Sequence, residues 1–336
     1  MLDIEQPQAL IAYLRQNGHI PPGEIPQVQP LPGGVSNRTV LVQRPDGTAS
    51  VLKQALERLR VPVEWFSSPE RIHREAAGLR WLARLAPGAL PAFVFEDHTA
   101  HILAMEAVRQ PHRNWKTMLL AGDLQTGHVE QFARLLARIH RGAGEHRAAI
   151  AAEFADRSFF ESLRLEPYYL YTAQQVPAAA GFLHALVSET RACRLTLVHG
   201  DYSPKNILVH DGRLILLDHE VIHFGDPAFD LGFSMAHLLS KAHHLPDQRA
   251  RFAEAARLAW RVYHGAVRDC DWAGSLEPRA VRHTLGCLLA RVAGRSQLEY
   301  LSQDERARQR AIVTALVAAP PRTLHDCITR FVADCE

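Results

Sequence analysis

The sequence lacks most features that mark secreted and membrane-spanning proteins. Its 336 residues include only five cysteines, and no two of them form a Cys-x-x-Cys pair. An odd number of widely spaced cysteines supports neither a disulfide framework nor a cysteine-based zinc site. Apolar stretches such as residues 311–319 are too short to cross a bilayer, and the acidic N-terminus is unlike a signal sequence. We therefore expect a cytoplasmic protein with no membrane partner.

A strong excess of either charge is also missing. The 38 Lys and Arg residues nearly balance the 36 Asp and Glu residues, which leaves a formal net charge of +2. This balance gives no electrostatic reason to expect nucleic acid as a partner. The 19 histidines are scattered without repeated metal-ligand spacing, so we expect most of them at surface or capping positions.

Residue patterns divide the chain near Val108. Before this residue, five strands are expected, with a short helix ahead of them and another that opens at residues 67–70 and ends near residue 85. The expected strands lie at residues 28–31, 39–42, 49–53, 93–95 and 101–105. Beyond Val108 helices dominate, at about residues 122–141, 178–194, 228–241, 248–267, 278–301, 304–317 and from 323, with short strands between 195 and 222. We predict an α+β fold with a strand-rich N-terminal lobe, residues 1–108, and a larger helical lobe, residues 109–336.

The segment from His199 to Val209 carries the densest chemical signal. Asp201 is followed five residues later by Asn206, and both lie between two apolar strands. This is the pattern of a phosphoryl-transfer loop, in which the Asp accepts the proton of the attacking hydroxyl and the Asn binds a metal ion. Asp218 follows the next strand, where a carboxylate can bridge Mg²⁺ to nucleotide phosphates. The alternative is a loop whose Asp and Asn only cap turns, which the placement of Asp218 disfavours.

The strand-rich lobe is expected to bind the nucleotide. Gly33 and Gly34 lie between two strands and can let backbone amides approach phosphates, although such a pair is also common in simple turns. Lys53 lies on a strand, and Glu75 lies on the apolar stripe of the next helix, where a carboxylate needs a partner. We predict a Lys53–Glu75 ion pair, with Glu70 as the second choice.

Two further segments complete the predicted nucleotide and loop contacts. Residues 106–108 (Glu106 to Val108) end the last strand of the first lobe and would act as the hinge whose backbone binds an adenine edge. Asp230 opens a helix too far from Asn206 to be the metal ligand, and we expect it to accept hydrogen bonds from backbone amides of the catalytic loop.

Together these motifs resemble the aminoglycoside phosphotransferase and choline kinase superfamily of protein-kinase-like small-molecule kinases. The segments that show this resemblance are residues 199–206 (HGDYSPKN), 216–220 (LLDHE) and 225–232 (GDPAFDLG). Residues 52–56 (LKQAL), the long spacing from Lys53 to Glu75, and the Asp218-x-Glu220 pair are similar to the methylthioribose kinase branch.

The resemblance implies a bilobal kinase-like fold, ATP (with GTP left open) and Mg²⁺. It implies Asp201 as the catalytic base and Lys53 with Glu75 as the pair that orients the phosphates. Metal ligands would be Asn206 and Asp218, with help from Glu220. The residues expected to contact the phosphates are Gly33, Gly34, Ser36, Asn37 and Lys205. Lys205 would stand in for the lysine that protein kinases carry two residues after the catalytic Asp.

The acceptor is expected to be a small hydroxylated molecule: a methylthioribose-like sugar, an amino alcohol or an aminoglycoside. Arg291 and Arg295 face either an anionic acceptor or solvent, and Trp115 either lines the cleft or packs the lobe junction. The helical lobe has no acidic run, which counts against an aminoglycoside. The alternative function is a catalytically silent nucleotide-binding protein on the same fold, and a homodimer is left open. A dinucleotide-binding dehydrogenase is excluded, because no GxGxxG motif joins a strand to a helix.

Overall fold

The computed structural model describes residues 2–32, 35–60 and 64–335, so the predicted Gly33 and Gly34 lie outside the described residues. The chain separates into two compact units. The smaller consists of Met1–Gln110 together with Asp218–Glu220, and the larger of Pro111–Leu217 together with Val221–Glu336. A strand-rich unit and a mostly helical unit confirm the predicted α+β class.

An antiparallel sheet of five strands forms the centre of the smaller unit, in the order β1-β2-β3-β5-β4. The strands are β1 (Gln27–Pro30), β2 (Asn37–Gln43), β3 (Ala49–Ala55), β4 (Phe93–Asp97) and β5 (Ile102–Glu106). Each overlaps a strand expected from the sequence. Two helices accompany the sheet, α1 (Pro7–Gln16) and α2 (Arg71–Leu85).

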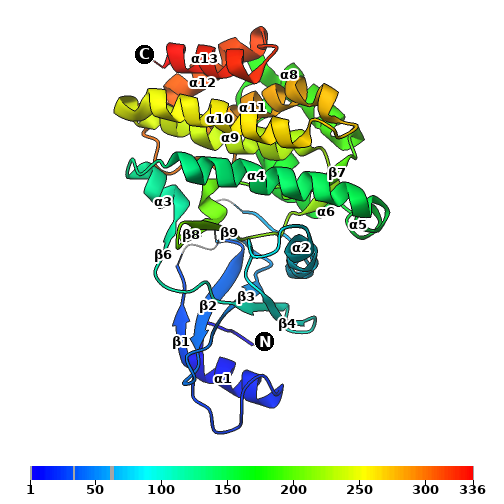
Figure 1. Ribbon diagram of the computed structural model, residues 1–336, viewed down its shortest axis with the longest axis vertical. Helices are drawn as coiled ribbons and strands as arrows, with labels where there is room; N and C mark the ends of the chain where they lie inside the picture. The colour runs from blue at the N-terminus through cyan, green and yellow to red at the C-terminus, as the bar shows by residue number, and fades with distance from the viewer. Residues whose placement is uncertain (1, 33–34, 61–63, 336) are drawn as a thin grey trace. The chain divides into compact units, whose positions relative to one another are not determined.

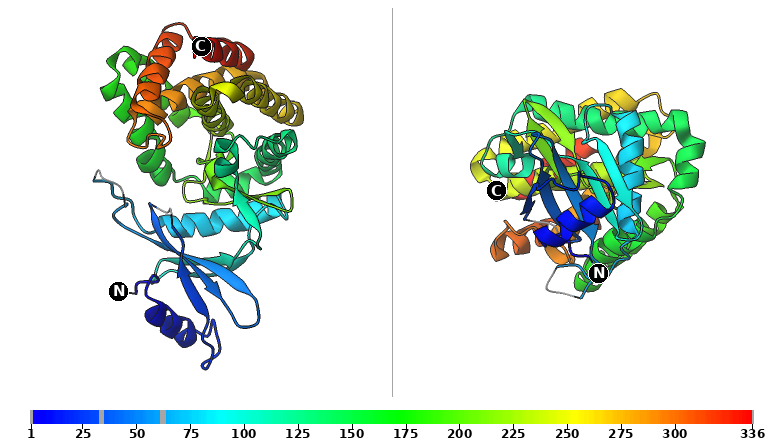
Figure 2. Two further views of the ribbon diagram at one scale, coloured as in Figure 1. Left: turned by 90° about the vertical axis from the view of Figure 1, so that its left-hand side faces the viewer. Right: turned by 90° about the horizontal axis from the view of Figure 1, so that it is seen from below.

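The two helices cover opposite faces of this sheet (Figure 2). Leu10 and Leu14 of α1 pack in one apolar cluster, and Ile72 and Leu79 of α2 pack in the other. Successive side chains of a strand point to opposite faces, so the continuous apolar run Ile102–Met105 of β5 contributes to both clusters. This double cover explains why β5 is apolar at four successive positions, Ile102–Met105, rather than alternating.

The larger unit is mainly helical (Figure 1). Its longer helices are α4 (Thr126–Gly142), α8 (Ala180–Ala192), α9 (Pro227–His244), α10 (Arg249–Val267), α11 (Leu276–Ala293), α12 (Gln303–Ala318) and α13 (Leu324–Asp334). The shorter ones are α3 (Trp115–Leu120), α5 (Arg147–Glu153), α6 (Ser158–Phe160), the π-helix η2 (Glu161–Leu170) and α7 (Tyr171–Gln175). Helix α9 packs between α10 and α11 and is buried over nearly its whole length. Among the described residues, none of these helices has both the length and the apolar character needed to cross a bilayer.

Two small sheets hold the segment around Asp201. Strand β7 (Thr196–Val198) pairs with β10 (His223–Gly225), and β8 (Ile207–His210) lies between β6 (His112–Asn114) and β9 (Arg213–Leu216). A two-residue turn joins β8 to β9 in a hairpin. Asp211 and Gly212 both have positive φ, 47° and 71°, as a two-residue hairpin turn requires. Strands β6 and β10 were not predicted, since three-residue strands leave little pattern in a sequence.

Two helix boundaries differ from those expected. Helix α11 ends at Ala293 rather than continuing to residue 301, and at Gly294 an added Cβ would lie 2.5 Å from the carbonyl oxygen of Ala290. Helix α2 begins at Arg71, just past the expected opening at residues 67–70, and the guanidinium of Arg71 donates back to the carbonyl oxygens of Ser67 and Ser68 at 2.9 and 3.0 Å.

Candidate active site

Asp201 lies in the buried loop that joins β7 to β8, and its carboxylate is held from several sides. Asn206 Nδ2 donates to Asp201 Oδ2 at 2.7 Å and to the Asp201 carbonyl oxygen at 3.0 Å. Lys205 Nζ lies 3.6 Å from the same Oδ2 atom. Because the amide nitrogen of Asn206 is used inside the loop, its Oδ1 is the atom that this side chain can offer to a cation.

Arg164 also holds Asp201, a contact that no sequence pattern indicated. Its Nη2 lies 3.1 Å from Asp201 Oδ1, and its Nε donates to the Gly200 carbonyl oxygen at 2.8 Å. Arg164 lies in the π-helix η2, a conformation that is rare and frequent at functional sites. No motif precedes or follows Arg164 in the sequence, so only the folded chain reveals this contact.

Asp230, at the start of α9, binds the backbone of the same loop. Its Oδ2 accepts from the His199 backbone N–H at 2.7 Å, and its Oδ1 accepts from that of Gly200 at 2.8 Å. These bonds confirm the expected role of Asp230. Burial alone would raise the pKa of Asp230, but the hydrogen bond and charge of His140 and the loop amides hold that pKa below its usual range. The carboxylate therefore remains ionised and orients the loop.

Gly200 is required by the same loop. Its φ is 79°, and an added Cβ would lie 2.9 Å from both the carbonyl oxygen and the Cγ2 atom of Val221. Left-handed backbone together with this close approach leaves room only for glycine. The Gly of the HGD motif is thus explained by geometry.

In the smaller unit, Lys53 on β3 lies between two carboxylates. Its Nζ donates to Glu75 Oε1 at 2.6 Å and to Asp218 Oδ1 at 2.9 Å. Lys53 is therefore paired with Glu75, whereas Glu70, the second choice, has its Oε1 3.6 Å from Nδ1 of His101. Asp218 has φ of 68°, a conformation uncommon outside glycine and frequent where function demands it.

The charges of this trio are strongly coupled. Burial lowers the pKa of Lys53, but the Asp218 and Glu75 carboxylates outweigh it and hold the pKa above its ordinary value. Burial, with the charges of Asp218 and Glu220, raises the pKa of Glu75 to about 7, although the Lys53 ammonium opposes the shift. Lys53 therefore stays cationic at neutral pH.

Arg71 is the second residue that the sequence did not reveal. Its side chain is fully buried. It donates to the carbonyl oxygens of Ser36 and Leu56, the latter at 2.7 Å, and its Nε lies 3.2 Å from Glu220 Oε2. Arg71 precedes Glu75 by one helical turn, and this i, i+4 relation was the available sign that both share a face.

The remaining predicted nucleotide contacts lie at the ends of strands β2 and β5. Ser36 and Asn37 are buried at the start of β2, and Ser36 is the residue whose carbonyl Arg71 binds. Glu106 is exposed at the end of β5, and its backbone N–H donates to Ala92 at 2.8 Å. Val108 follows in the segment that leaves the sheet.

Four basic side chains, here named the cationic cluster, gather within the larger unit: Lys116, Arg164, Lys241 and Arg291. Arg291 is buried and donates to the hydroxyl of Tyr168 at 2.9 Å, so it is not on a solvated helix face. The guanidinium of Arg164 lies 5.6 Å from the ring centre of the same tyrosine. Tyr168 thus connects Arg291 to Arg164, which holds Asp201.

Lys241 is the most deeply buried member of the cationic cluster. Its Nζ donates to the His237 carbonyl oxygen at 3.2 Å and lies 5.2 Å from the ring centre of Tyr300. Burial, reinforced by the charges of Lys116 and Arg291, lowers the pKa of Lys241 to about 7. Glu299 opposes this shift and forms an ion pair with Lys116. An ammonium group in these surroundings gains from an additional negative charge.

Two other candidates have ordinary structural roles. Trp115 is fully buried, with its ring 4.8 Å from that of Phe132, so it packs inside the larger unit. Arg295 pairs with Glu166 at 3.1 Å rather than extending the cationic cluster.

Comparison with known proteins identifies a family and several relatives. The phosphotransferase enzyme family profile matches residues 27–270. A methylthioribose kinase from Pectobacterium carotovorum is 25% identical over 297 residues. The match covers 75% of this chain and 72% of the length of that kinase. A methylthioribose kinase from Yersinia pseudotuberculosis is 24% identical over 267 residues, covering 70% of this chain and 64% of its own.

Solved structures share the fold at lower identity. An amicoumacin kinase in complex with AMP-PNP, Ca²⁺ and Ami has a TM-score of 0.61 at 15% identity, over 90% of this chain and 91% of its own. A macrolide 2'-phosphotransferase from Brachybacterium faecium has a TM-score of 0.53 at 19% identity, over 94% of this chain and 99% of its own. These likenesses show the kinase-like fold.

Proposed function

The chain belongs to the phosphotransferase enzyme family, and we propose that it transfers the γ-phosphoryl group of ATP to a hydroxyl of a small acceptor. The observation that carries this proposal is the constrained carboxylate of Asp201, held by Arg164 through one oxygen and by Asn206 through the other. A carboxylate fixed in this way can orient an acceptor hydroxyl and take its proton as the phosphoryl group arrives.

The smaller unit supplies the residues proposed for ATP. Lys53 is cationic and is oriented by its hydrogen bond to Glu75, and we propose that it binds the α- and β-phosphates. The segment from Gly33 to Asn37 is proposed to cover the phosphates with backbone amides, and Glu106 to Val108 to contact the adenine edge. Lys205, half exposed near Asp201, is placed to neutralise the γ-phosphate.

Asn206 and Asp218 are the proposed ligands of Mg²⁺. An amide oxygen and a carboxylate are oxygen donors of the kind that Mg²⁺ prefers, and Asp218 directs its Oδ1 at Lys53, the residue proposed to contact the phosphates. Glu220 is a weaker candidate, because its Oε2 binds Arg71. When bound, Mg²⁺ neutralises charge on the phosphate oxygens.

We further infer that the acceptor carries a negative group, such as the carboxylate of a sugar acid or a phosphate. The cationic cluster supports this inference, because Arg164 links Asp201 through Tyr168 to Arg291 and the cluster includes the buried Lys241. A polycationic aminoglycoside or choline would be repelled there. A neutral methylthioribose-like sugar, suggested by the relatives, is the second choice.

A catalytically silent nucleotide-binding protein is disfavoured, since the base, the lysine and both oxygen ligands are all present. The test is nucleotide consumption, with ATP and separately with GTP, against a panel of gluconate, a sugar phosphate, methylthioribose, choline, homoserine and an aminoglycoside. Mass spectrometry of the product must show one added phosphate. We expect turnover with anionic acceptors and about a thousandfold loss in Asp201→Asn, since the general base is removed.

Asp211→Asn is the matched control, because Asp211 is an exposed turn residue in a conformation that Asn adopts readily. Full turnover in Asp201→Asn would remove Asp201 from the mechanism. Turnover confined to choline or the aminoglycoside would overturn the anionic acceptor and leave the kinase assignment intact.

A further inference from the structure

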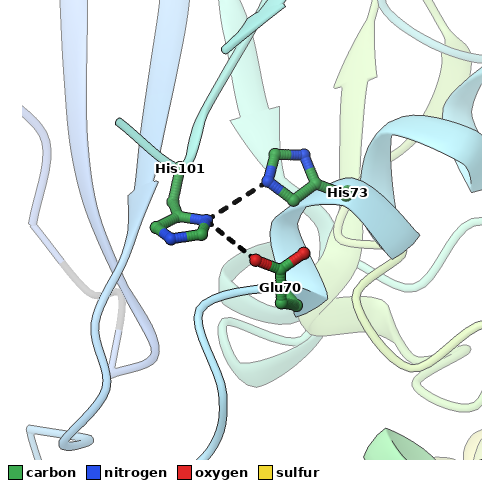
Figure 3. A group of neighbouring side chains, drawn as sticks. All are labelled: Glu70, His73 and His101. Carbon is green, nitrogen blue, oxygen red and sulfur yellow. Dashed lines mark hydrogen bonds and ion pairs between the residues drawn. The ribbon is translucent and has the colours of Figure 1, made fainter. Parts of the chain in front are cut away.

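Outside the candidate active site, histidine and carboxylate side chains converge on one edge of the smaller unit (Figure 3). His73 lies in the first turn of α2, and Glu70 is the residue just before that helix. His101 directly precedes β5. His73 Nε2 lies 3.2 Å from His101 Nδ1, and Glu70 Oε1 lies 3.6 Å from the same nitrogen. Three ligand-type atoms from two separate segments thus meet at one point.

We propose that His73, His101 and Glu70 form a binding site for a transition metal ion of the zinc class. A tetrahedral Zn²⁺ with ligands at about 2.0 to 2.1 Å places its ligand atoms about 3.3 Å apart, close to the spacing found here. Imidazole nitrogens with one carboxylate favour such ions over Mg²⁺ or Ca²⁺. With these three protein ligands, the fourth position belongs to water.

Glu96 provides the outer contact that histidine ligands usually have. Its Oε1 lies 2.6 Å from His73 Nδ1, and its Oε2 accepts from Arg80 at 2.8 Å. A carboxylate only accepts, so Nδ1 of His73 is the donor in this contact, and Nε2 is the ring nitrogen that faces His101.

A second grouping, His73 with Glu96 and His98, is a poorer site. A metal there would have to replace the short hydrogen bond between His73 Nδ1 and Glu96. It would also draw on a carboxylate already bound by Arg80, and on His98, whose side chain is 73% exposed. A metal at Nε2 of His73 would replace only the longer contact with His101 Nδ1, at 3.2 Å, and would leave the contact with Glu96 in place.

The proposed metal would join the start of α2 to the start of β5. His73 precedes Glu75 by two residues, and Glu75 holds Lys53. An ion bound at His73 therefore fixes the end of the helix that carries the carboxylate partner of Lys53. Binding of metal to the folded chain should also raise its apparent stability.

The test is a titration of the full chain with Zn²⁺ alone, without nucleotide, against a chromogenic chelator. We expect one ion bound per chain with micromolar affinity, and Co²⁺ should give the visible absorption bands of a tetrahedral site. His101→Asn should weaken binding at least tenfold and abolish the thermal shift. Asn suits this position because residue 101 has φ of 50°, which Asn tolerates.

His73→Gln is the second variant and should lose binding equally, while Glu70→Gln should lose less. His184→Gln, on the exposed surface of α8, is the control and should bind like the unmodified chain. Unchanged affinity in both His73→Gln and His101→Asn, or no binding below about 100 µM, would overturn the proposal. Lys53→Met should retain Zn²⁺ binding, so failure of the kinase proposal would not be mistaken for failure of this one.

Discussion

Lys241 shows how one buried charged residue can lower the stability of the folded chain. Its ammonium group is buried on α9 among other cations, and its pKa falls to about 7. In the unfolded chain this group has the ordinary pKa of 10.5, so below pH 10.5 the folded state holds it at a disadvantage. A ligand with a negative group offsets that disadvantage.

Lys241→Met should therefore stabilise the ligand-free protein. The gain should be largest at pH 7 and below, up to about 4 kcal/mol, and should vanish as the pH rises toward 10.5. Urea unfolding at pH 7, 8.5 and 10 measures it. A gain that does not change with pH would contradict the lowered pKa, and unchanged KM for an anionic acceptor would contradict the proposed role.

Arg164 makes two contacts that a lysine cannot reproduce together. We expect Arg164→Lys to lower kcat about tenfold to a hundredfold with little change in KM for ATP, because Asp201 loses its fixed orientation. Arg191→Lys is the control, since Arg191 forms an exposed ion pair with Glu161 on the surface. Equal kcat in the two variants would show that Arg164 does not position Asp201.

At the scale of elements, Asp230 links α9 to the loop that carries Asp201 through two hydrogen bonds. Asp230→Asn keeps one acceptor and loses the charge, so we expect a loss of about 2 to 3 kcal/mol in the free energy of unfolding. Because the pKa of Asp230 is lowered, the wild-type contribution is present above about pH 4 and fades below it.

Chemical denaturation at pH 7 tests this expectation, with Asp211→Asn as the exposed control. A change below about 0.5 kcal/mol, the usual range for surface positions, would mean that the loop keeps its shape without the carboxylate.

Helix α2 shows how far sequence patterns reach. Glu75 stood out because a carboxylate interrupted an apolar stripe, and the pair with Lys53 followed from the need to neutralise it. Arg71 occupies the same face one turn earlier, but an arginine near a helix start is ordinary on a surface. Its partners, the carbonyls of Ser36 and Leu56, belong to segments that only the fold brings near.

At the scale of the whole molecule, nucleotide binding should be visible as added stability. AMP-PNP with Mg²⁺ at a hundredfold excess over its dissociation constant should contribute about 2.7 kcal/mol and raise the thermal midpoint by a few degrees. Lys53→Met should abolish this shift because the phosphates lose their cation. A full shift in Lys53→Met would show that Lys53 does not contact the nucleotide.

The Asp218–Glu220 segment shows a limit of reading domains from sequence. By position it falls inside the helical part of the chain, and we assigned it to residues 109–336. It groups with the smaller unit instead, because Asp218 binds Lys53 and Glu220 binds Arg71. Ion pairs over a separation of about 150 residues have no local pattern.

The sequence by itself determined the five strands of the sheet, the motif that contains Asp201 and Asn206, and the role of Asp230. These depend on strand alternation and on spacings of a few residues, where backbone geometry leaves few choices. Only the tertiary structure decided that Arg164 holds Asp201, that Lys241 is buried among cations and that His73 meets His101. Such contacts join segments far apart in the chain, and their geometry is set by packing rather than by local spacing.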